Sequence, residues 1–205
     1  VAINLFGSWK RMAMALGVED ISEHADRIAE LLQPEIPEGF WAKVQMLPRF
    51  AGLAKVPPRP YRGDPPCQEI VLEGADADLR RIPVMTCWPG DAGPFITLPM
   101  VITRDPETGV QNVGCYRMQV TGPHTTMMHW QRHKGGAAHF RKYRERGERM
   151  PVVVALGADP ATMYTPTAPL PPGIDEYLLS GFLRREPLLT ATAKTADLRI
   201  PAAAE

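Results

Sequence analysis

The sequence predicts an α+β protein, in which an N-terminal helical segment precedes a mostly antiparallel sheet, or a partly open barrel, with helical insertions. The first observation is the helical spacing of apolar residues over 1–33, which gives way after Pro57 to short alternating or wholly apolar runs. The second is the spread of 22 prolines and 17 glycines along the chain, which favours short elements joined by ordered loops. We therefore expect a helical segment over 1–56 and a sheet domain over 57–205.

Capping residues and apolar stripes predict the N-terminal helices. Gly7-Ser8 is a start signal for a first helix, and Gly17 ends that helix. A second helix is expected over 21–33, where the apolar residues form one stripe. A further short helix pair is expected over 37–54.

Alternating and apolar runs predict the strands of the second domain. The runs 94–104 and 110–120 are joined by a turn sequence at 105–109, so they are expected to pair as an antiparallel hairpin. The continuous apolar run 150–157 is typical of a strand buried on both faces. The remaining candidates are strands at 67–74, 76–88, 125–133, 188–195 and 197–205, and helices at 137–147 and 174–186.

Composition excludes several classes of protein. Lys and Arg number 23 and Asp and Glu also number 23, so no net charge favours binding to nucleic acid or to an anionic membrane. The three cysteines lack a CxxC spacing, which argues against a disulfide framework and against a zinc ribbon. No apolar run reaches the ~20 residues of a membrane span, and the first residues lack the features of a signal peptide. A cytoplasmic location is therefore expected.

Polar side chains interrupt segments that are otherwise apolar. Asn112 and Arg117 lie five residues apart in the run NVGCYRMQV, so a regular strand would turn them to opposite faces. Either one of them lies at the surface, or a bulge or a strand end turns both toward one site. His133 lies beside a Gly-Gly pair, and Glu176 lies near a predicted helix start.

An amide, an imidazole and a carboxylate from separate segments form one candidate metal site. Such a ligand set suits a divalent ion of intermediate hardness, Mn²⁺ rather than Zn²⁺. Gly135-Gly136 would also let backbone N–H groups approach a phosphate.

Ordinary structural roles compete with this interpretation. Asn112 after a turn is typical of a local cap, and Arg117 of a surface or ion-paired residue. Glu176 near a helix start is explained by the helix dipole alone. His133 competes with three other histidines of the same region for any role, namely His124, His129 and His139.

Five motifs in sequence order resemble one known family. They are CQEIVLEGADADLRRIPVMTCWPGDAGPFIT, NVGCYRMQV, HWQRHKGGAAHF, MPVVVALGADPATMY and LPPGIDEYLLSGFLRRE. Together they resemble the UbiD family of prenylated-FMN-dependent decarboxylases, and PVMTCWPGDAGP is most similar to the branch that acts on polyprenyl-4-hydroxybenzoate. The resemblance implies a split β-barrel of the flavin-reductase-like type.

The resemblance also implies the site residues. Asn112, His133 and Glu176 would bind Mn²⁺ together with the flavin phosphate, and Arg117 would be catalytic, facing the flavin and the substrate carboxylate. A K⁺ site would use backbone carbonyls of the loop 164–171 and share Glu176. The residues that would contact prenylated FMN are Asn112, Gly114, Cys115, Tyr116, Arg117, Arg132, His133, Thr167, Ala168 and Pro169.

The expected function is the non-oxidative decarboxylation of an aromatic or α,β-unsaturated acid, with polyprenyl-4-hydroxybenzoate as the expected substrate. The resemblance further implies a homo-oligomer, dependence on a flavin prenyltransferase, no nucleic-acid partner, and contact with a membrane surface through a polyprenyl substrate. The family's proton donor lies in an EGPxG motif that this sequence does not contain. We therefore expect the N-terminal, flavin-binding portion of a decarboxylase, without the C-terminal assembly domain. The alternative is a non-catalytic flavin- or phosphate-binding fragment or subunit that needs a partner chain.

Overall fold

The computed structural model describes residues 4–32, 56–170 and 174–205. It confirms the α+β class: three sheets of three strands each are combined with helices, and within the described residues no sheet closes into a barrel. The helix pair expected over 37–54 lies outside the described residues. No helix in the described part of the chain is both long enough and apolar enough to cross a bilayer.

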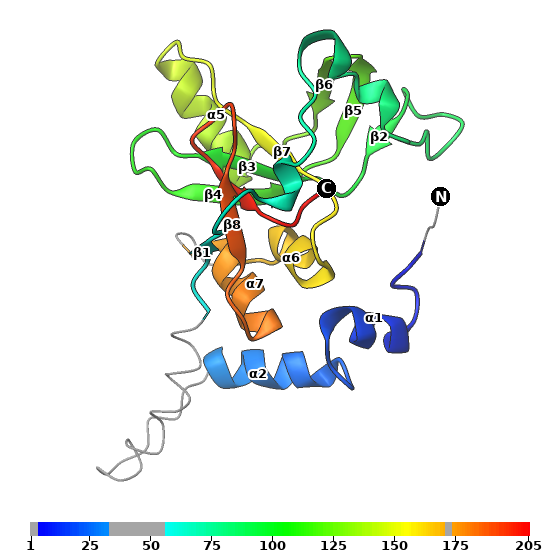
Figure 1. The fold of residues 1–205 in the computed structure, drawn as a ribbon, viewed down its shortest axis with the longest axis vertical. Helices are drawn as coiled ribbons and strands as arrows, with labels where there is room; N and C mark the ends of the chain where they lie inside the picture. The colour runs from blue at the N-terminus through cyan, green and yellow to red at the C-terminus, as the bar shows by residue number, and fades with distance from the viewer. Residues whose placement is uncertain (1–3, 33–55, 171–173) are drawn as a thin grey trace.

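The two N-terminal helices form as the sequence predicts. In α1 (Trp9–Leu16) the Ser8 hydroxyl accepts a hydrogen bond from the Arg11 N–H, and Gly17 ends the helix in the left-handed conformation at φ 69°. Helix α2 (Ser22–Leu32) lies below α7 (Glu176–Arg184) in Figure 1. The Arg27 guanidinium ties α2 to α7, because it donates to the Phe182 carbonyl at 2.5 Å and lies 4.5 Å from the centre of the Phe182 ring.

The central sheet has the strand order β4-β3-β7 and is antiparallel throughout. Its strands are β3 (Met100–Arg104), β4 (Gln111–Cys115) and β7 (Val153–Ala155). The predicted hairpin is confirmed, since β3 pairs with β4 across the turn at 105–109. The Asp105 carboxylate stabilises this turn by accepting hydrogen bonds from the Glu107 and Thr108 N–H groups.

Two smaller sheets flank the central one. The sheet β2-β5-β6 projects away from α7 as an arm at the upper right of Figure 1. In the sheet β1-β8-β9, β1 runs parallel to β8 and β9 runs antiparallel to it. Their strands are β2 (Phe95–Ile96), β5 (Met118–Gly122), β6 (Thr125–Met128), β1 (Arg59–Pro60), β8 (Leu189–Thr192) and β9 (Arg199–Pro201).

Helices cover both faces of the central sheet (Figure 1). On one face Met100, Ile102 and Val113 pack with Tyr177 of α7 in the main core. On the other, Val101 packs with Tyr116 in a second cluster, beside α5 (Gly135–Glu145). The remaining helical elements are α6 (Pro160–Tyr164) and the 3₁₀ turns η1 (Pro66–Gln68), η2 (Gly74–Asp76), η3 (Leu79–Arg81) and η4 (Thr165–Thr167).

Two strand predictions are wrong. The segments 67–74 and 76–88 contain only 3₁₀ turns and extended chain. Ile70 is 79% exposed, and Val71 and Leu72 are exposed as well, so the apolar residues of the alternating pattern do not enter the core, and in the described part of the chain the segment pairs with no strand. A strand without a partner leaves its backbone hydrogen bonds to water, and the apolar pattern alone does not hold it in register.

The run 110–120 is not one strand. It divides into β4 and β5, which belong to different sheets and are separated by Tyr116 and Arg117. The strand expected over 125–133 is likewise shorter, because β6 ends at Met128 before the turn that leads into α5.

A buried histidine predicts a pH dependence of stability. The His139 side chain lies against Thr103, and burial lowers its pKa below the usual 6.5, with Asp105 raising it and Lys142 lowering it further. The unfolded chain binds a proton on this imidazole as the pH falls through 6.5, whereas the folded chain does not, so stability is lost below that pH. Thermal melts between about pH 7.5 and about pH 5.5 should therefore show a steeper fall in Tm for the wild type than for His139→Gln. Equal slopes would contradict the assignment.

Candidate functional site

One face of β4 forms the floor of a small polar cradle. Asn112, Gly114 and Tyr116 follow each other at two-residue spacing, and the Tyr116 ring lies over Gly114, where a methyl group would overlap it. The Tyr116 hydroxyl accepts hydrogen bonds from the Gly136 N–H at 3.2 Å and from the Asn112 amide at 3.5 Å. These two bonds link the strand to the start of α5.

The start of α5 forms the wall of the cradle. A methyl group on Gly135 would overlap the Asn112 amide oxygen, and one on Gly136 would lie 3.1 Å from Trp130 Nε1. Lys134 is the N-cap residue of α5, and its side chain makes no capping hydrogen bond. The start of this 11-residue helix therefore has two adjacent glycines and the positive end of the helix dipole, and of its first N–H groups that of Gly136 already donates to Tyr116.

An indole N–H beside the cradle lacks a partner. Trp130 Nε1 is buried, and no atom of the described residues accepts its hydrogen. The ring is held by aromatic contacts, at right angles to Tyr116 with centroids 6.2 Å apart and tilted on Phe140 at 5.5 Å. An unsatisfied buried donor costs ~1–3 kcal/mol, so an anion or other acceptor at this place would stabilise the arrangement.

Glu176 meets the same strand at the free edge of the sheet. It is the first residue of α7, whose N-cap Asp175 accepts from the Tyr177 N–H at 2.9 Å. The Glu176 carboxylate accepts from the Val113 N–H at 3.1 Å, directly beside Asn112 in the chain. Glu176 is therefore bonded to the β4 residue that follows Asn112.

Burial perturbs this carboxylate. Desolvation raises the pKa of Glu176 to about 7, and the negative charge of Asp175 acts in the same direction, while the N–H groups of Val113 and Glu176 lower it. Among the described residues, no positive side chain contributes to the pKa of Glu176. A half-buried carboxylate whose charge is not balanced by a positive side chain is suited to binding a cation.

His133 lies in the turn that leads into α5, and its side chain is exposed. His133 lies two residues before Gly135, the glycine that contacts Asn112. Arg132 is exposed as well, and its carbonyl accepts from the Arg141 guanidinium at 2.7 Å. In the described part of the chain no three His, Cys, Asp or Glu side chains form a metal cluster. The predicted ligands Asn112, His133 and Glu176 are not such a cluster, because one of the three is an amide.

Arg117 lies where β4 has ended and β5 has not begun. Its guanidinium is exposed and lies 5.4 Å from the centre of the Phe95 ring. Arg117 therefore lies at the surface, just beyond the end of β4, which is the first of the two alternatives for its odd spacing from Asn112. The neighbouring Cys115 is half-buried, and burial raises the pKa of its thiol, so it stays protonated at neutral pH.

The loop that follows α6 passes close to β4. Its 3₁₀ turn η4 contains Thr167, whose hydroxyl donates to the Tyr164 carbonyl at 2.6 Å. Ala168 is half-buried and Pro169 is exposed. The structure thus brings this loop, the cradle and Glu176 to one strand.

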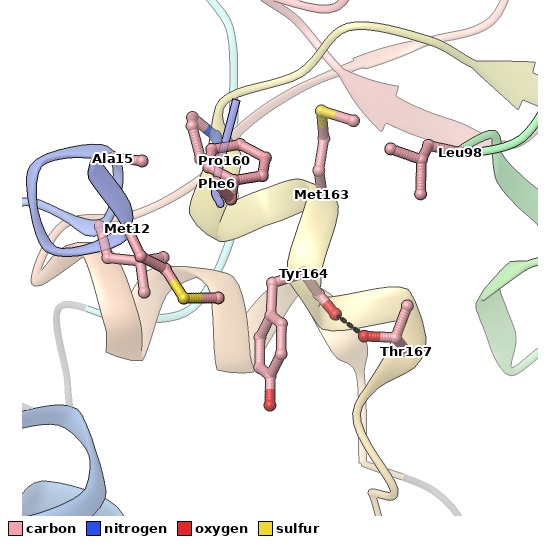
Figure 2. A pocket seen from close by; sticks show the side chains of 9 residues that line it. Phe6, Met12, Ala15, Leu98, Pro160, Met163, Tyr164 and Thr167 are labelled. Carbon is pink, nitrogen blue, oxygen red and sulfur yellow. Dashed lines mark hydrogen bonds between the residues drawn. The ribbon is translucent and has the colours of Figure 1, made fainter. Parts of the chain in front are cut away.

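Sequence reasoning missed an apolar cavity beside the loop. Figure 2 shows its side chains, which come from α1, from α6 and from Phe6, Leu98 and Thr167, and its volume is about 180 Å³. Thr167 lies at its edge, so the cavity and the predicted cofactor loop share a residue. The lining contains no charged side chain. Its methionines are indistinguishable from core residues in the sequence.

Comparisons with known proteins place these features in a family. Residues 59–205 match the family model described as UbiD, 3-octaprenyl-4-hydroxybenzoate carboxy-lyase Rift-related domain. A protein of unassigned function from Archaeoglobus fulgidus is 46% identical over 206 residues, covering 100% of this chain and 42% of its own length.

Solved structures show the same likeness. The UbiD-class enzyme HmfF from Pelotomaculum thermopropionicum in complex with FMN is 28% identical, with a TM-score of 0.77 over 97% of this chain and 40% of its own. An evolved dimeric form of HmfF with prFMN gives the same identity and TM-score, over 42% of its own length. Apo 3,4-dihydroxybenzoic acid decarboxylase from Klebsiella pneumoniae is 25% identical, with a TM-score of 0.72 over 99% of this chain and 39% of its own.

The chain spans about two fifths of the length of these relatives. The family model covers well over half of the chain, and the Archaeoglobus relative matches all of it. The chain therefore belongs to the UbiD family of decarboxylases.

Proposed function

We propose that the chain is the flavin-binding part of a carboxy-lyase that releases CO₂ from an aromatic or α,β-unsaturated acid without net oxidation, using prenylated FMN. The observation that carries the proposal is the cradle at the start of α5, where Gly135 and Gly136 let the helix pack directly against Asn112, Tyr116 and Trp130, and no atom of the described residues accepts from the Trp130 N–H. A helix N-terminus with two glycines is suited to a phosphate. HmfF, a structural relative, binds FMN and prFMN.

The donor atoms around the cradle fit a phosphate with its metal ion. Asn112 and Glu176 would supply oxygen ligands to Mn²⁺ and His133 a nitrogen ligand. The raised pKa of Glu176 and the absence of a positive side chain among its influences support a cation here. A K⁺ ion would take backbone carbonyls of the loop 164–171 and share the Glu176 carboxylate.

Prenylated FMN, when bound, supplies the electron-accepting ring system that takes up charge as CO₂ leaves. The side chains of this chain would bind and orient the flavin and the substrate. Arg117 would hold the substrate carboxylate, because a guanidinium stays charged and pairs bidentately with it. The other residues proposed to contact the flavin are Gly114, Cys115, Tyr116, Arg132, Thr167, Ala168 and Pro169.

Polyprenyl-4-hydroxybenzoate is the proposed substrate, supported by the family description. A polyprenyl tail would bring a cytoplasmic protein to the membrane surface. We further propose a homo-oligomer that receives its cofactor from a flavin prenyltransferase, and a division of the chain into a helical segment (1–56) and a flavin-binding domain (57–205). The start of the family match at residue 59 supports this boundary.

A second candidate is a flavin- or phosphate-binding module that requires a partner chain for turnover. The observation that favours it is the coverage of the relatives, about two fifths of their length. Both candidates require FMN binding, and they differ in turnover.

A titration tests the proposal. The purified chain, titrated with FMN in the presence of Mn²⁺, should quench flavin fluorescence with a Kd of ~1 µM or below, the affinity of a genuine cofactor site. Co-expression with a flavin prenyltransferase should give the absorbance and mass of a bound modified flavin. FMN fluorescence unchanged at millimolar protein would refute both candidates. CO₂ release from aryl acids by the reconstituted chain would exclude the second one.

A further inference from the structure

Two positions on the central hairpin meet two positions on α5. Thr103 of β3 lies directly opposite Asn112 of β4, so both side chains project from the same face of the sheet. Gly135 and His139 are four residues apart on α5 and share one face of the helix. Asn112 contacts Gly135, and Thr103 Oγ1 lies 2.9 Å from His139 Nδ1.

The second of these contacts is inside the protein. Thr103 is 0% exposed and His139 is 8% exposed. The Thr103 hydroxyl can donate to an unprotonated Nδ1 or accept from a protonated one, so either neutral tautomer satisfies the pair. A hydrogen bond between two buried side chains fixes both the distance and the rotation of the helix on the sheet.

A third contact continues along the same helix face. Lys142 pairs with Asp105 at 2.7 Å and with Glu107 at 2.7 Å, at the turn of the hairpin. This pair is partly exposed and therefore worth little by itself. Together with the Gly136 N–H bond to the Tyr116 hydroxyl, the Thr103–His139 bond is a buried, directional contact between α5 and this face of the sheet, and it lies one helical turn from the cradle.

We propose that Thr103 and His139 are positioning residues for the phosphate-binding end of α5. The inference rests on the proposed function, because it assumes that the flavin phosphate lies at Gly135. Donor groups that bind an anion must be held to within about 0.5 Å of their place, and the bond holds the first turn of α5 against Asn112. Neither side chain touches the ligand.

The test separates positioning from stability. Thr103→Val keeps the β-branched shape but leaves the His139 nitrogen without a partner, and Thr103→Ser keeps the hydroxyl. In the full chain with Mn²⁺, Thr103→Val should weaken FMN binding roughly fivefold to tenfold, the effect of losing one buried hydrogen bond. Thr103→Ser should restore the wild-type Kd. Riboflavin, which lacks the phosphate, should bind all variants alike.

A double variant and a matched control complete the design. Thr103→Val with His139→Leu replaces both partners by apolar groups, which restores stability, so its Tm should recover while FMN binding stays weak. Thr190→Val removes the hydroxyl of another buried strand threonine, bonded to the Arg59 carbonyl at 3.4 Å in a different sheet, and should leave FMN binding unchanged.

Three results would overturn the inference. They are unchanged FMN binding in Thr103→Val, an equal loss of riboflavin and FMN, and recovery of FMN binding together with Tm in the double variant. If the wild-type chain binds no FMN, the proposed function itself fails, and this outcome is distinct because it needs no variant.

Discussion

Gly135→Ala is expected to abolish FMN binding, with a loss of at least ~100-fold in affinity. A methyl group at this position would overlap the Asn112 amide oxygen, so Asn112 would have to leave its place or α5 would have to move off the sheet. Either movement opens the cradle that we propose for the phosphate. Fluorescence titration with FMN and Mn²⁺ measures the effect.

The backbone conformation at Gly135 does not itself exclude alanine, so a loss of FMN binding would be due to the overlap with Asn112. Gly135 lies in a helix and does not have a positive φ, and alanine normally stabilises such a position by ~1 kcal/mol. An alanine without a steric conflict would therefore raise Tm and leave FMN binding intact. Gly90→Ala is the matched control, because nothing lies within 4 Å of its added methyl group. Normal FMN binding by Gly135→Ala would remove the cradle from the proposed site.

The sequence predicts those parts of the fold whose signals are local. The hairpin β3–β4 could be predicted because an apolar run meets a turn sequence in which the Asp105 side chain caps the chain. Helix α1 could be predicted because Ser8 and Gly17 mark its ends. In both cases the residues that specify the structure make their contacts within the same short segment.

Non-local pairing is where the prediction fails. The segment 67–74 alternates as a strand does, yet no neighbouring strand meets it, and Ile70 is 79% exposed. The pattern of the run 110–120 predicts one strand. In the structure the Tyr116 ring lies over Gly114, and the chain after Tyr116 continues into a strand of another sheet. Neither the missing strand partner nor the change of sheet can be predicted from the residues of the segment alone, because both depend on distant parts of the chain.

The site shows the same division. Asn112, His133 and Glu176 could be singled out as polar residues in apolar surroundings, and the structure brings Asn112 to Gly135 and Glu176 to the Val113 N–H. The partnership of Thr103 with His139 could not be predicted, because it depends on which strand residue lies opposite Asn112 and on the rotation of α5.

Glu176→Gln is expected to make the metal-free chain more stable and to weaken its binding of the metal ion. The amide oxygen can still accept from the Val113 N–H, so the local structure is kept, while a charge that burial disfavours is removed. In EDTA at about pH 8, Tm should rise by about 2–4 °C, the shift that ~1 kcal/mol produces in a chain of this size.

The same variant should bind Mn²⁺ at least ~100-fold more weakly, since even an indirect partner of a metal ligand contributes 10–100-fold. The added stability that Mn²⁺ and FMN together give to the wild type should disappear with it, because ligand binding to the folded state alone is what raises Tm. Glu145→Gln is the control, an exposed glutamate in α5, and should change neither Tm nor metal binding. Calorimetric titration with Mn²⁺ and thermal melts with and without EDTA decide the matter. A lower Tm without metal would show that Glu176 is a structural residue, and an unchanged Mn²⁺ affinity would exclude it as a ligand.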